Sequence, residues 1–468
     1  MGGEIIPTEK LVQLCSKIGS GATPRGGSSV YLDSGEISLI RSQNVLDNEF
    51  SRVGLVFIEP EAAGRLSNVV VEEGDVLLNI TGDSVARCCQ VDSGILPARV
   101  NQHVAIIRPK KELLNAKYLR YFLVSAPMQN YMLGLAGAGA TRNALTKGMI
   151  EDFDVPLPRF ETQKAIAHIL GTLDDKIELN RQMNATLEAM AQALFKSWFV
   201  DFDPVIDNVL AAGNSIPEPL QAKAEVRAAL GDQRKPLPEA IQKQFPSRFV
   251  FSEEMGWIPE GWTVEELPNV IDFLEGPGIR NWQYTESDNG IKFINIRCIQ
   301  NGDLLLDTAN RITKDEAFGK YAHFQLAVDD IVVSTSGTLG RYAFVRKEHL
   351  PLSLNTSVIR FRKIEGVSTL HLIAGYVDTK LQWELEIRAS GSVQRNFGPM
   401  HLKQIKMLLP KFDILQSHEA IVEPLFRKRQ ANLIGSDGIL KLRDTLLPKL
   451  LSGELRIPDA EKLVADSV

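Results

Sequence analysis

The chain repeats itself at a spacing close to half its length. The stretch Pro158-Arg159-Phe160-Glu161 returns as Pro410-Lys411-Phe412-Asp413, an offset of 252 in a chain of 468 residues. Asn180 returns as Asn432 at the same offset. An ordered series of such matches along both halves drifts only from about 252 to about 255, which is the signature of a duplicated structural unit. We therefore expect two copies of one fold in tandem.

Each copy has two parts. The first part contains short β-branched and aromatic runs broken by Gly, Asn and Asp, which predict the strands of a mixed α/β domain. The second part has helical periodicity. The predicted boundaries are a first mixed α/β domain at 1–160, a long helix at 161–203, a Pro-rich connector at 204–261, a second mixed α/β domain at 262–412, a second long helix at 413–456 and a C-terminal tail at 457–468.

Both long helices carry a stripe with alternating spacings of four and three, typical of a coiled-coil seam. A buried Asn on such a seam costs stability but fixes the register of the helices. The seam residues are Leu173, Asn180, Leu187 and Leu194 in the first helix and Leu425, Asn432, Ile439 and Leu446 in the second. Two unrelated amphipathic helices, each packing on its own domain, are the alternative. The matching stripes favour an α+β fold in which two similar domains are joined by an antiparallel coiled coil with pseudo-twofold symmetry.

The second helix is predicted to be the weaker of the two. Its stripe also includes Lys428 and Gly435, and Gly438 lies in the same helix. Each Gly costs a helix about 1 kcal/mol relative to Ala. We therefore expect this helix to depend on its partner.

Searches for catalytic and metal-binding motifs find none. The Gly-rich run 134–141 lacks the Lys of a phosphate-binding loop, and no Pro-Pro dipeptide is present, so the amino-methyltransferase motif is absent. The four Cys include no C-x-x-C pair and the His residues form no ligand pair, which predicts buried thiols and no metal site. The chain is therefore expected to be non-catalytic and to hold no cofactor.

Charge and hydropathy restrict the partners and the compartment. The net charge of −6 gives no overall basic field for nucleic acid, so any DNA binding must come from local clefts or a more basic partner. No apolar run is long enough to span a membrane, and the N-terminus shows no signal pattern. We expect a cytoplasmic protein.

The expected architecture suits a particular kind of DNA reading. Two similar modules held apart by a helix pair have the geometry for two half-sites along a duplex. Because the modules differ in sequence, the half-sites would differ too, which predicts a bipartite, asymmetric target with an unread spacer.

Three motifs carry a specific resemblance. The run 194–204, LFKSWFVDFDP, resembles the central conserved region of type I restriction–modification specificity (S) subunits. The run 441–454, KLRDTLLPKLLSGE, resembles their distal conserved region, and IPEGW at 258–262 resembles the entry to their second target recognition domain. The chain departs from the family pattern at Gly435-Ser-Asp-Gly438, where a helix-favouring run is more usual.

The resemblance implies a DNA-reading subunit whose chemistry lies in its partners. Two methyltransferase subunits, which bind S-adenosylmethionine, would dock on the helices, and restriction subunits that use ATP and Mg would join them. A subunit of a methylation-only complex is an alternative. An enzyme with an unrecognised site and a coiled-coil adaptor for protein partners also stay open.

Direct readout uses Arg or Lys for guanine and Asn or Gln for adenine. The candidate DNA-binding residues lie in predicted loops, and they are Arg25, Gln43, Asn44, Asn101, Arg142, Asn143, Arg280, Arg297, Arg341, Asn355, Arg395 and Asn396. Solvated loops or backbone-capping Asn side chains are the alternative for each.

Candidates that occur in both copies are interpreted differently from the others. Equivalence between domains that read different sequences suits phosphate positioning or fold support better than base readout. The shared pairs are Arg142 with Arg395, Asn143 with Asn396, and Asn101 with Asn355. The better base-reading candidates are unshared, namely Arg25, Gln43, Arg280, Arg297 and Arg341.

Phe195, Trp198 and Phe199 are candidates for the partner-binding surface. Three aromatic residues within five positions cannot all lie on one narrow seam, so some should meet another domain or the methyltransferase. Packing of the helix end on its own domain is the alternative.

Overall fold

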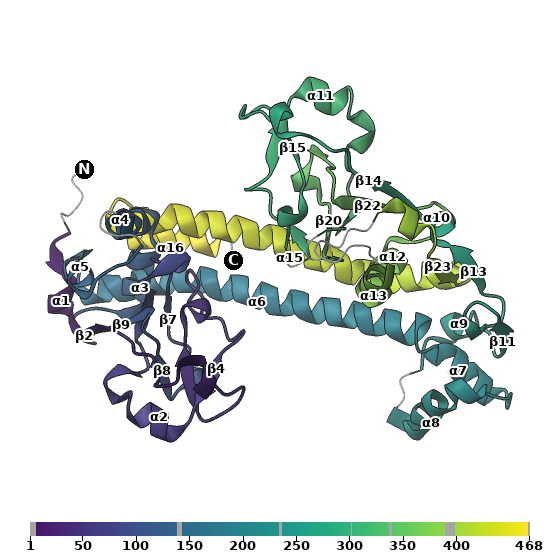
Figure 1. The fold of residues 1–468 in the computed structure, drawn as a ribbon, viewed down its shortest axis with the longest axis horizontal. Coiled ribbons are helices and arrows are strands. Elements are labelled where there is room, and N and C mark those ends of the chain that lie inside the picture. The colour runs from purple at the N-terminus through teal and green to yellow at the C-terminus, as the bar shows by residue number, and fades with distance from the viewer. Residues whose placement is uncertain are drawn as a thin grey trace. The chain divides into compact units, whose positions relative to one another are not determined.

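A computed structural model describes residues 6–137, 143–233, 236–300, 302–336, 339–388 and 398–466. The chain divides into two compact units. The first consists of Met1–Arg181 and Leu433–Val468, and the second is Gln182–Asn432. Each unit is therefore built from one mixed α/β domain and parts of both long helices, as the ribbon in Figure 1 shows.

The first unit contains two four-stranded sheets. Their orders are β2-β9-β6-β7, which is entirely antiparallel, and β4-β3-β8-β5, in which β3 and β8 run parallel. A separate pair, β1 with β10, joins the start and the end of the domain. The strands are β1 Thr8–Lys10, β2 Cys15–Ser20, β3 Ile37–Ile40, β4 Val56–Ile58, β5 Val70–Val71, β6 Val76–Asn79, β7 Cys88–Gln90, β8 Ala98–Val100, β9 Val104–Pro109 and β10 Asp154–Pro156.

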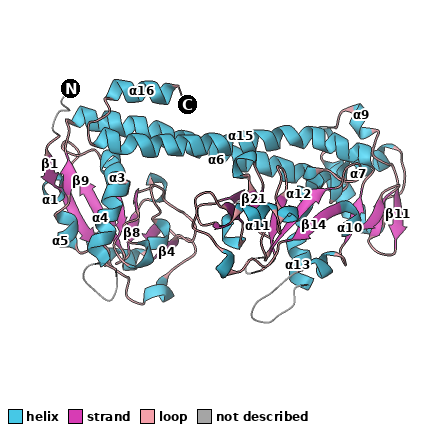
Figure 2. Cartoon of the chain, turned by 90° about the horizontal axis from the view of Figure 1, so that it is seen from above, coloured by secondary structure: helices cyan, strands magenta, loops and turns pink. Residues whose placement is uncertain are grey.

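The second unit repeats this topology. Its sheets have the orders β14-β22-β19-β20 and β18-β15-β21, and β13 pairs with β23 as β1 pairs with β10. A hairpin of β16 and β17 is added. The strands, drawn in magenta in Figure 2, are β13 Thr263–Glu266, β14 Ile271–Glu275, β15 Ile291–Phe293, β16 Ile299–Gln300, β17 Asp303–Leu304, β18 Asn310–Ile312, β19 Ile331–Ser334, β20 Tyr342–Phe344, β21 Leu352–Ser353, β22 Val358–Lys363 and β23 Lys406–Leu409. The predicted duplication is confirmed by the main sheet, by the shared strands of the second sheet and by the closing strand pair.

One buried ion pair occurs at the same place in both sheets. The fully buried Asp75 accepts from Arg108 Nε at 2.7 Å, and Asp330, 1% exposed, accepts from Arg362 Nε at 2.6 Å. Each carboxylate also caps the preceding turn through a backbone N–H. Because a buried carboxylate needs such partners, this contact fixes the turn before the central strand in both repeats.

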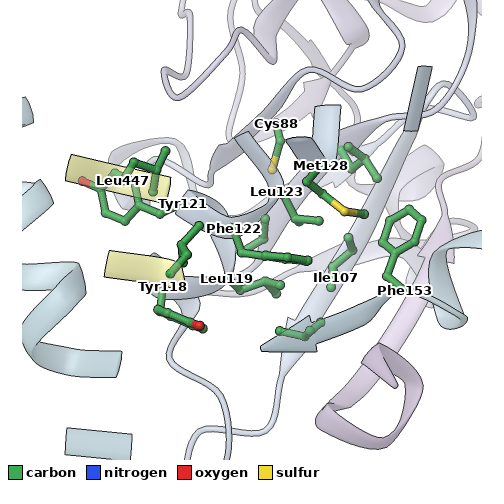
Figure 3. Packing of buried hydrophobic residues seen from close by; sticks show 14 of the residues in the cluster. Cys88, Ile107, Tyr118, Leu119, Tyr121, Phe122, Leu123, Met128, Phe153 and Leu447 are labelled. Carbon is green, nitrogen blue, oxygen red and sulfur yellow. The ribbon is translucent and has the colours of Figure 1, made fainter. Parts of the chain in front are cut away.

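Each domain also contains short helices that pack on its sheets. In the first domain they are α1 Leu11–Leu14, α2 Pro60–Gly64, α3 Ala116–Val124, α4 Ala126–Gly137 and α5 Lys147–Glu151. In the second they are α10 Leu267–Val270, α11 Lys314–Phe318, α12 Leu370–Tyr376, the π-helical turn η12 Val377–Leu381, α13 Gln382–Arg388 and α14 Pro399–Leu402. Figure 3 shows the core of the first unit, where Tyr121 of α3 lies beside Leu447 of the second long helix.

The cysteines match the prediction of buried thiols. Cys15, Cys88, Cys89 and Cys298 are all buried and reduced. Burial raises the pKa of the Cys89 thiol to about 12, so this side chain stays neutral and packs as a small apolar group.

The two long helices are α6, Phe160–Phe199, and α15, Phe412–Leu451, each 40 residues long. In the first unit the start of α6 packs on the end of α15, since Asp174 pairs with Arg443 at 2.9 Å and Asn180 donates to Ser436 Oγ at 3.1 Å. The numbering of the two helices runs in opposite directions along these contacts. The pair is therefore antiparallel, as predicted.

In the second unit the end of α6 packs on the start of α15 in the same way. Asn432 donates to Asn184 Oδ1 at 2.9 Å, and Arg429 lies 3.8 Å from Glu188. Since 432 is the repeat equivalent of 180, and 436 of 184, the two Asn contacts are pseudo-symmetric copies of one another. Both predicted seam Asn residues are 6% exposed and pair across the helices, which confirms their placement.

The predicted stripe is correct at most positions and wrong at two, since Lys428 and Gly435 are both exposed. Leu173, Ile439 and Leu446 are buried, while Leu187, Leu194 and Leu425 are half-buried. Lys428, predicted on the stripe, is exposed, and the neighbouring Arg429 is buried in its place. The guanidinium of Arg429 faces Glu188 of α6, so an ionic contact takes the position that the spacing assigned to Lys428.

The predicted connector is ordered into short elements. They are α7 Asp203–Ala211, α8 Gln221–Ala229, α9 Glu239–Gln242 and the hairpin of β11 Phe249–Ser252 with β12 Gly256–Pro259. The predicted C-terminal tail contains a helix, α16 Ile457–Ala465, whose Ala460 and Val464 are buried in the first unit. Among the described residues, no helix is long and apolar enough to cross a membrane.

Candidate nucleic-acid interface

In the first unit the loops that follow β2, β3, β6 and β8 meet beside the segment before α5. We call residues 21–26, 41–44, 80–84, 101–103 and 143–145 loop cluster 1. Backbone hydrogen bonds join these loops, from Gly21 N to Val104 O at 2.9 Å, from Asn101 N to Ile40 O at 3.0 Å, from Ile80 N to His103 O at 3.0 Å and from Gly82 N to Asn143 O at 3.1 Å. The cluster is thus a connected backbone frame on a rigid sheet, a common platform for binding residues.

Three predicted DNA-binding residues are exposed on loop cluster 1, namely Arg25, Gln43 and Asn143. Gln43 makes a long contact of 3.3 Å with Gly54 O, and Asn143 uses its carbonyl to hold the loop at Gly82. Their side chains are therefore available to a ligand. Arg142 lies outside the described residues.

Two predicted residues of the first unit are buried. Asn44 is fully buried and donates to Ser51 O at 2.9 Å, while its Oδ1 accepts from Arg41 N at 3.0 Å. Asn101 is 6% exposed, and its Oδ1 accepts from His103 N at 3.1 Å. This burial argues against direct DNA contact by either side chain and matches the alternative stated for them, the support of loop backbone.

Loop cluster 2 is the equivalent surface of the second unit. It comprises residues 276–284, 294–298, 334–336, 339–341 and 354–357. The joining hydrogen bonds run from Gly276 N to Val358 O at 3.2 Å, from Ile294 N to Ser353 O at 3.0 Å, from Thr335 N to Ser357 O at 2.9 Å and from Thr356 N to Pro277 O at 2.9 Å. The bonds from Gly276 and Thr335 are the repeat equivalents of those from Gly21 and Ile80, so both units join their loops at the same ends of their strands.

The three unshared Arg candidates of the second unit, Arg280, Arg297 and Arg341, are all exposed on loop cluster 2. Arg341 also lines a cavity of 530 Å³ that includes Gln300 and Gln382. Asn355 is 6% exposed and accepts from Ile279 N at 3.1 Å, as Asn101 supports its own loop. Arg395 and Asn396 lie outside the described residues.

One candidate was missed from the sequence. Trp282 is 80% exposed, next to Arg280 in the short 3₁₀ turn Asn281–Gln283. The neighbouring Gln283 is buried and donates to Tyr321 Oη at 2.9 Å, which anchors the turn and leaves the indole outward. An exposed large aromatic residue in a loop is a signal of binding that a search for polar readout residues does not register.

Burial also shifts the pKa of two side chains near the loop clusters. Desolvation raises the pKa of Glu275, at the end of β14, above its usual value. It lowers the pKa of Arg99 on β8, whose guanidinium stays charged because the unperturbed value is so high.

The aromatic partner-binding candidates are not on the surface. Phe195, Trp198 and Phe199 are 4%, 1% and 7% exposed, within the core of the second unit. Phe199 and His418 have ring centroids 4.9 Å apart, and Trp198 and Phe245 are 5.0 Å apart. These contacts argue against a partner surface made by the three rings and match the alternative, packing of the helix end on a domain.

The duplicated frame coincides with two matches to a known family. Residues 8–189 and 259–433 match the family described as the type I restriction modification DNA specificity domain. The chain belongs to this family. Each matched segment starts at the first strand of a repeat and extends into its long helix, so the two specificity domains are the two structural repeats.

Named relatives agree along nearly the whole chain. The specificity subunit of the type I restriction enzyme HindI from Haemophilus influenzae is 26% identical, and the alignment covers 90% of this chain and 94% of that protein. The MjaIX specificity subunit from Methanocaldococcus jannaschii is 23% identical over 96% of this chain and 94% of its own length. Resemblance to specificity subunits, predicted from three motifs, is confirmed.

A solved structure shares the fold. The crystal structure of a type I restriction-modification S subunit from M. genitalium aligns with a TM-score of 0.52 at 13% identity, covering 95% of each chain. This likeness supports the architecture of two specificity domains joined by long helices.

Proposed function

We propose that this chain is the DNA-sequence-recognition subunit of a type I restriction–modification complex, with one half-site read by each specificity domain. The observation that supports it best is the pair of loop clusters. Their backbone frames are the same, but their exposed side chains differ, with Arg25 and Gln43 on one and Arg280, Arg297 and Arg341 on the other. A shared frame with different contacts is what a bipartite, asymmetric target requires.

Under this proposal, recognition and catalysis belong to different subunits. Recognition and scaffolding belong to this chain, which would hold no cofactor. Methyltransferase subunits that bind S-adenosylmethionine, and restriction subunits that use ATP and Mg, would supply the chemistry. Partners would also supply part of the phosphate contacts that dominate affinity for DNA, since this chain has a net charge of −6. Relatives named as specificity subunits of type I restriction enzymes support this division.

Long-read methylation mapping of the genome, with and without the gene, tests the proposal directly. We expect loss of one motif made of two short half-sites around a fixed gap. Replacing residues 8–160 by the corresponding segment of a relative should then change one half-site and leave the other intact. Methylation that is unchanged by deletion, in cells that make the protein and its partners, would contradict the proposal.

Point variants assign residues within the half-sites. Arg280→Ala or Trp282→Ala should weaken specific DNA binding by the assembled complex about 10-fold or more, because one good base contact contributes about 1–3 kcal/mol of discrimination. Arg65→Ala is the matched control, since Arg65 is an exposed cation that follows β4, at the opposite end of the strands from loop cluster 1. An equal loss in Arg280→Ala and Arg65→Ala would place the effect of Arg280 in general electrostatics and contradict base readout by this residue.

A further inference from the structure

A tight turn in loop cluster 1 presents an exposed glutamine. Residues 101–104 join β8 to β9, and Val104 N donates to Asn101 O at 3.1 Å, which closes a β-turn. The side chain of Asn101 accepts from His103 N at 3.1 Å and tightens the same turn. Gln102 and His103 are therefore its two central residues, of which Gln102 is exposed and His103 is half-buried.

The backbone of this turn is fixed to its neighbours on both sides. Gly21 N donates to Val104 O at 2.9 Å, and Ile80 N donates to His103 O at 3.0 Å. These bonds come from the loops that follow β2 and β6. Since two other loops hold the turn, the backbone of Gln102 has a defined place on the surface of loop cluster 1.

The side chain of Gln102 is held as well. Its amide Nε2 lies 3.0 Å from His103 Nε2, and His103 Nδ1 lies 2.6 Å from Thr81 Oγ1. An amide nitrogen can only donate, so His103 Nε2 accepts. The hydrogen of the neutral imidazole then lies on Nδ1, which donates to Thr81 Oγ1. The three side chains thus form one directed series of hydrogen bonds that ends at Gln102.

This series leaves Gln102 with one acceptor and one donor for a ligand. One amide N–H is used on His103, so Oε1 and the second N–H remain. In the major groove adenine presents the N6–H donor beside the N7 acceptor, and a Gln amide pairs with both. Guanine presents two acceptors there, so the amide oxygen would have no partner on it. The free groups of Gln102 therefore match the edge of adenine.

His103 makes this match selective because it fixes the orientation of the amide. An unheld Gln amide can turn by half a rotation, exchange its oxygen and nitrogen, and so adapt to other bases. Contact with His103 Nε2 keeps the nitrogen of Gln102 on the side of the imidazole. Thr81 in turn holds the ring. A recognition side chain that is oriented by a supporting residue loses less entropy on binding and discriminates more sharply.

We propose that Gln102 reads an adenine in the half-site of the first specificity domain, with His103 and Thr81 as positioning residues. This role rests on the proposed DNA-recognition function. It adds to that function a residue outside the predicted set and the base that this residue selects.

The second repeat lacks this series of side chains. At offsets of 254 and 255, the equivalents of Thr81, Gln102 and His103 are Ser336, Thr356 and Ser357. None of these three residues has an amide or an imidazole side chain. The held adenine contact is therefore specific to one half-site and contributes to the asymmetry of the target.

Methylation mapping in cells that make the complete complex tests this role. Gln102→Ala should lower the preference for adenine at one position of one half-site about 10-fold or more, while the other positions stay as in the wild type. Thr81→Val keeps the side-chain shape but removes the acceptor, and should relax the same position to a smaller extent. Gln13→Ala is the matched control, since Gln13 is exposed on α1, at the opposite end of β2 from loop cluster 1.

The base preference at a single position separates positioning from general support of the loop. A loop that loses its shape would weaken contacts across the whole half-site. A Gln102 amide that is released to rotate should change the preference at one position. His103→Ala should therefore relax that position, and His103→Gln, whose amide oxygen can accept from Gln102, should restore part of the preference.

Three outcomes would overturn the role of Gln102. Unchanged selectivity at every position in Gln102→Ala would exclude the contact and leave the recognition function intact. Weakening across the whole half-site in Thr81→Val would show support of the loop in place of positioning. Absence of any methylation motif that depends on the wild-type gene would contradict the recognition function itself, and the adenine contact with it.

Discussion

The two specificity domains hold the same link with opposite charges. In the first, Arg52 lies before β4 and donates to Asp92, which follows β7, at 2.6 Å. In the second, Asp303 lies three residues before the position equivalent to Arg52, and it accepts from Arg346, the equivalent of Asp92, at 2.8 Å. The side chains are 62% and 28% exposed in the first pair but 15% and 6% in the second.

This difference shows which features of the contact are kept in both repeats and which vary. The link between the two loops is retained, whereas its polarity and its burial are not. The Asp75–Arg108 and Asp330–Arg362 pairs, by contrast, keep the same residue types in both repeats. We infer that contacts inside the main sheet are fixed, while contacts at its margin vary with the sequences around them.

Replacing Arg52 or Arg346 should give the largest difference between the domains in the free energy of unfolding. Arg346→Leu removes the guanidinium that pairs with the largely buried Asp303 and should cost about 3–5 kcal/mol. Arg52→Leu breaks an exposed pair that solvent screens, so its loss of stability should be much smaller. Urea unfolding, with hydrogen exchange to locate the affected unit, measures both. Equal losses would mean that burial does not distinguish the two links.

Replacing one glycine in each loop cluster should lower the stability of both domains by a similar amount. A Cβ on Gly21 would lie 2.2 Å from Asn101 O, and one on Gly276 would lie 2.1 Å from Asn355 O. Gly21→Ala and Gly276→Ala should each destabilise by about 2–3 kcal/mol, because the backbone must shift. Gly19→Ala and Gly278→Ala are the controls, since nothing lies within 4 Å of the added atom. A loss in only one domain would show that the frames differ in stiffness.

Two substitutions in the second long helix should have a smaller effect, and they should stabilise the chain. Gly435 and Gly438 lie within α15, and an added Cβ would meet nothing within 4 Å at either position. Gly435→Ala and Gly438→Ala should therefore each stabilise the chain by about 0.5–1 kcal/mol. Thr186→Ala, at the position of α6 equivalent to Gly438, is the comparison and should change stability less. Thermal unfolding distinguishes them, and destabilisation by either Gly variant would contradict an open helix surface.

Breaking the exposed pair of Arg52 and Asp92 should have the smallest effect on stability, and this effect should depend on pH. The hydrogen bond from Arg52 holds the pKa of Asp92 below its usual value. A lowered folded-state pKa stabilises the native state above the usual Asp pKa, and this stabilisation is lost as pH falls through the folded value. Wild type and Arg52→Leu should thus differ slightly at pH 7 and converge in acid, as measured by urea midpoints. A difference that grows in acid would contradict the assigned pair.

The sequence predicted the duplication, the antiparallel helices and the two seam asparagines, because the repeat offset and the helical spacing can both be read from the order of the residues. It could not predict that Asn44 is buried, since loop packing depends on residues far away in sequence. It placed Lys428 on the seam because spacing alone does not register the pairing of Arg429 with Glu188.

The paired asparagines bear on how new specificities are inherited. Each long helix carries both members of the contact, a donor Asn at one position and an acceptor four residues later, at 180 and 184 or at 432 and 436. A recombination event that exchanges the α/β portion of one repeat leaves these four codons in place. Under the proposed function, a variant gene would therefore acquire a new half-site in one step, while the alignment of the helices is inherited unchanged.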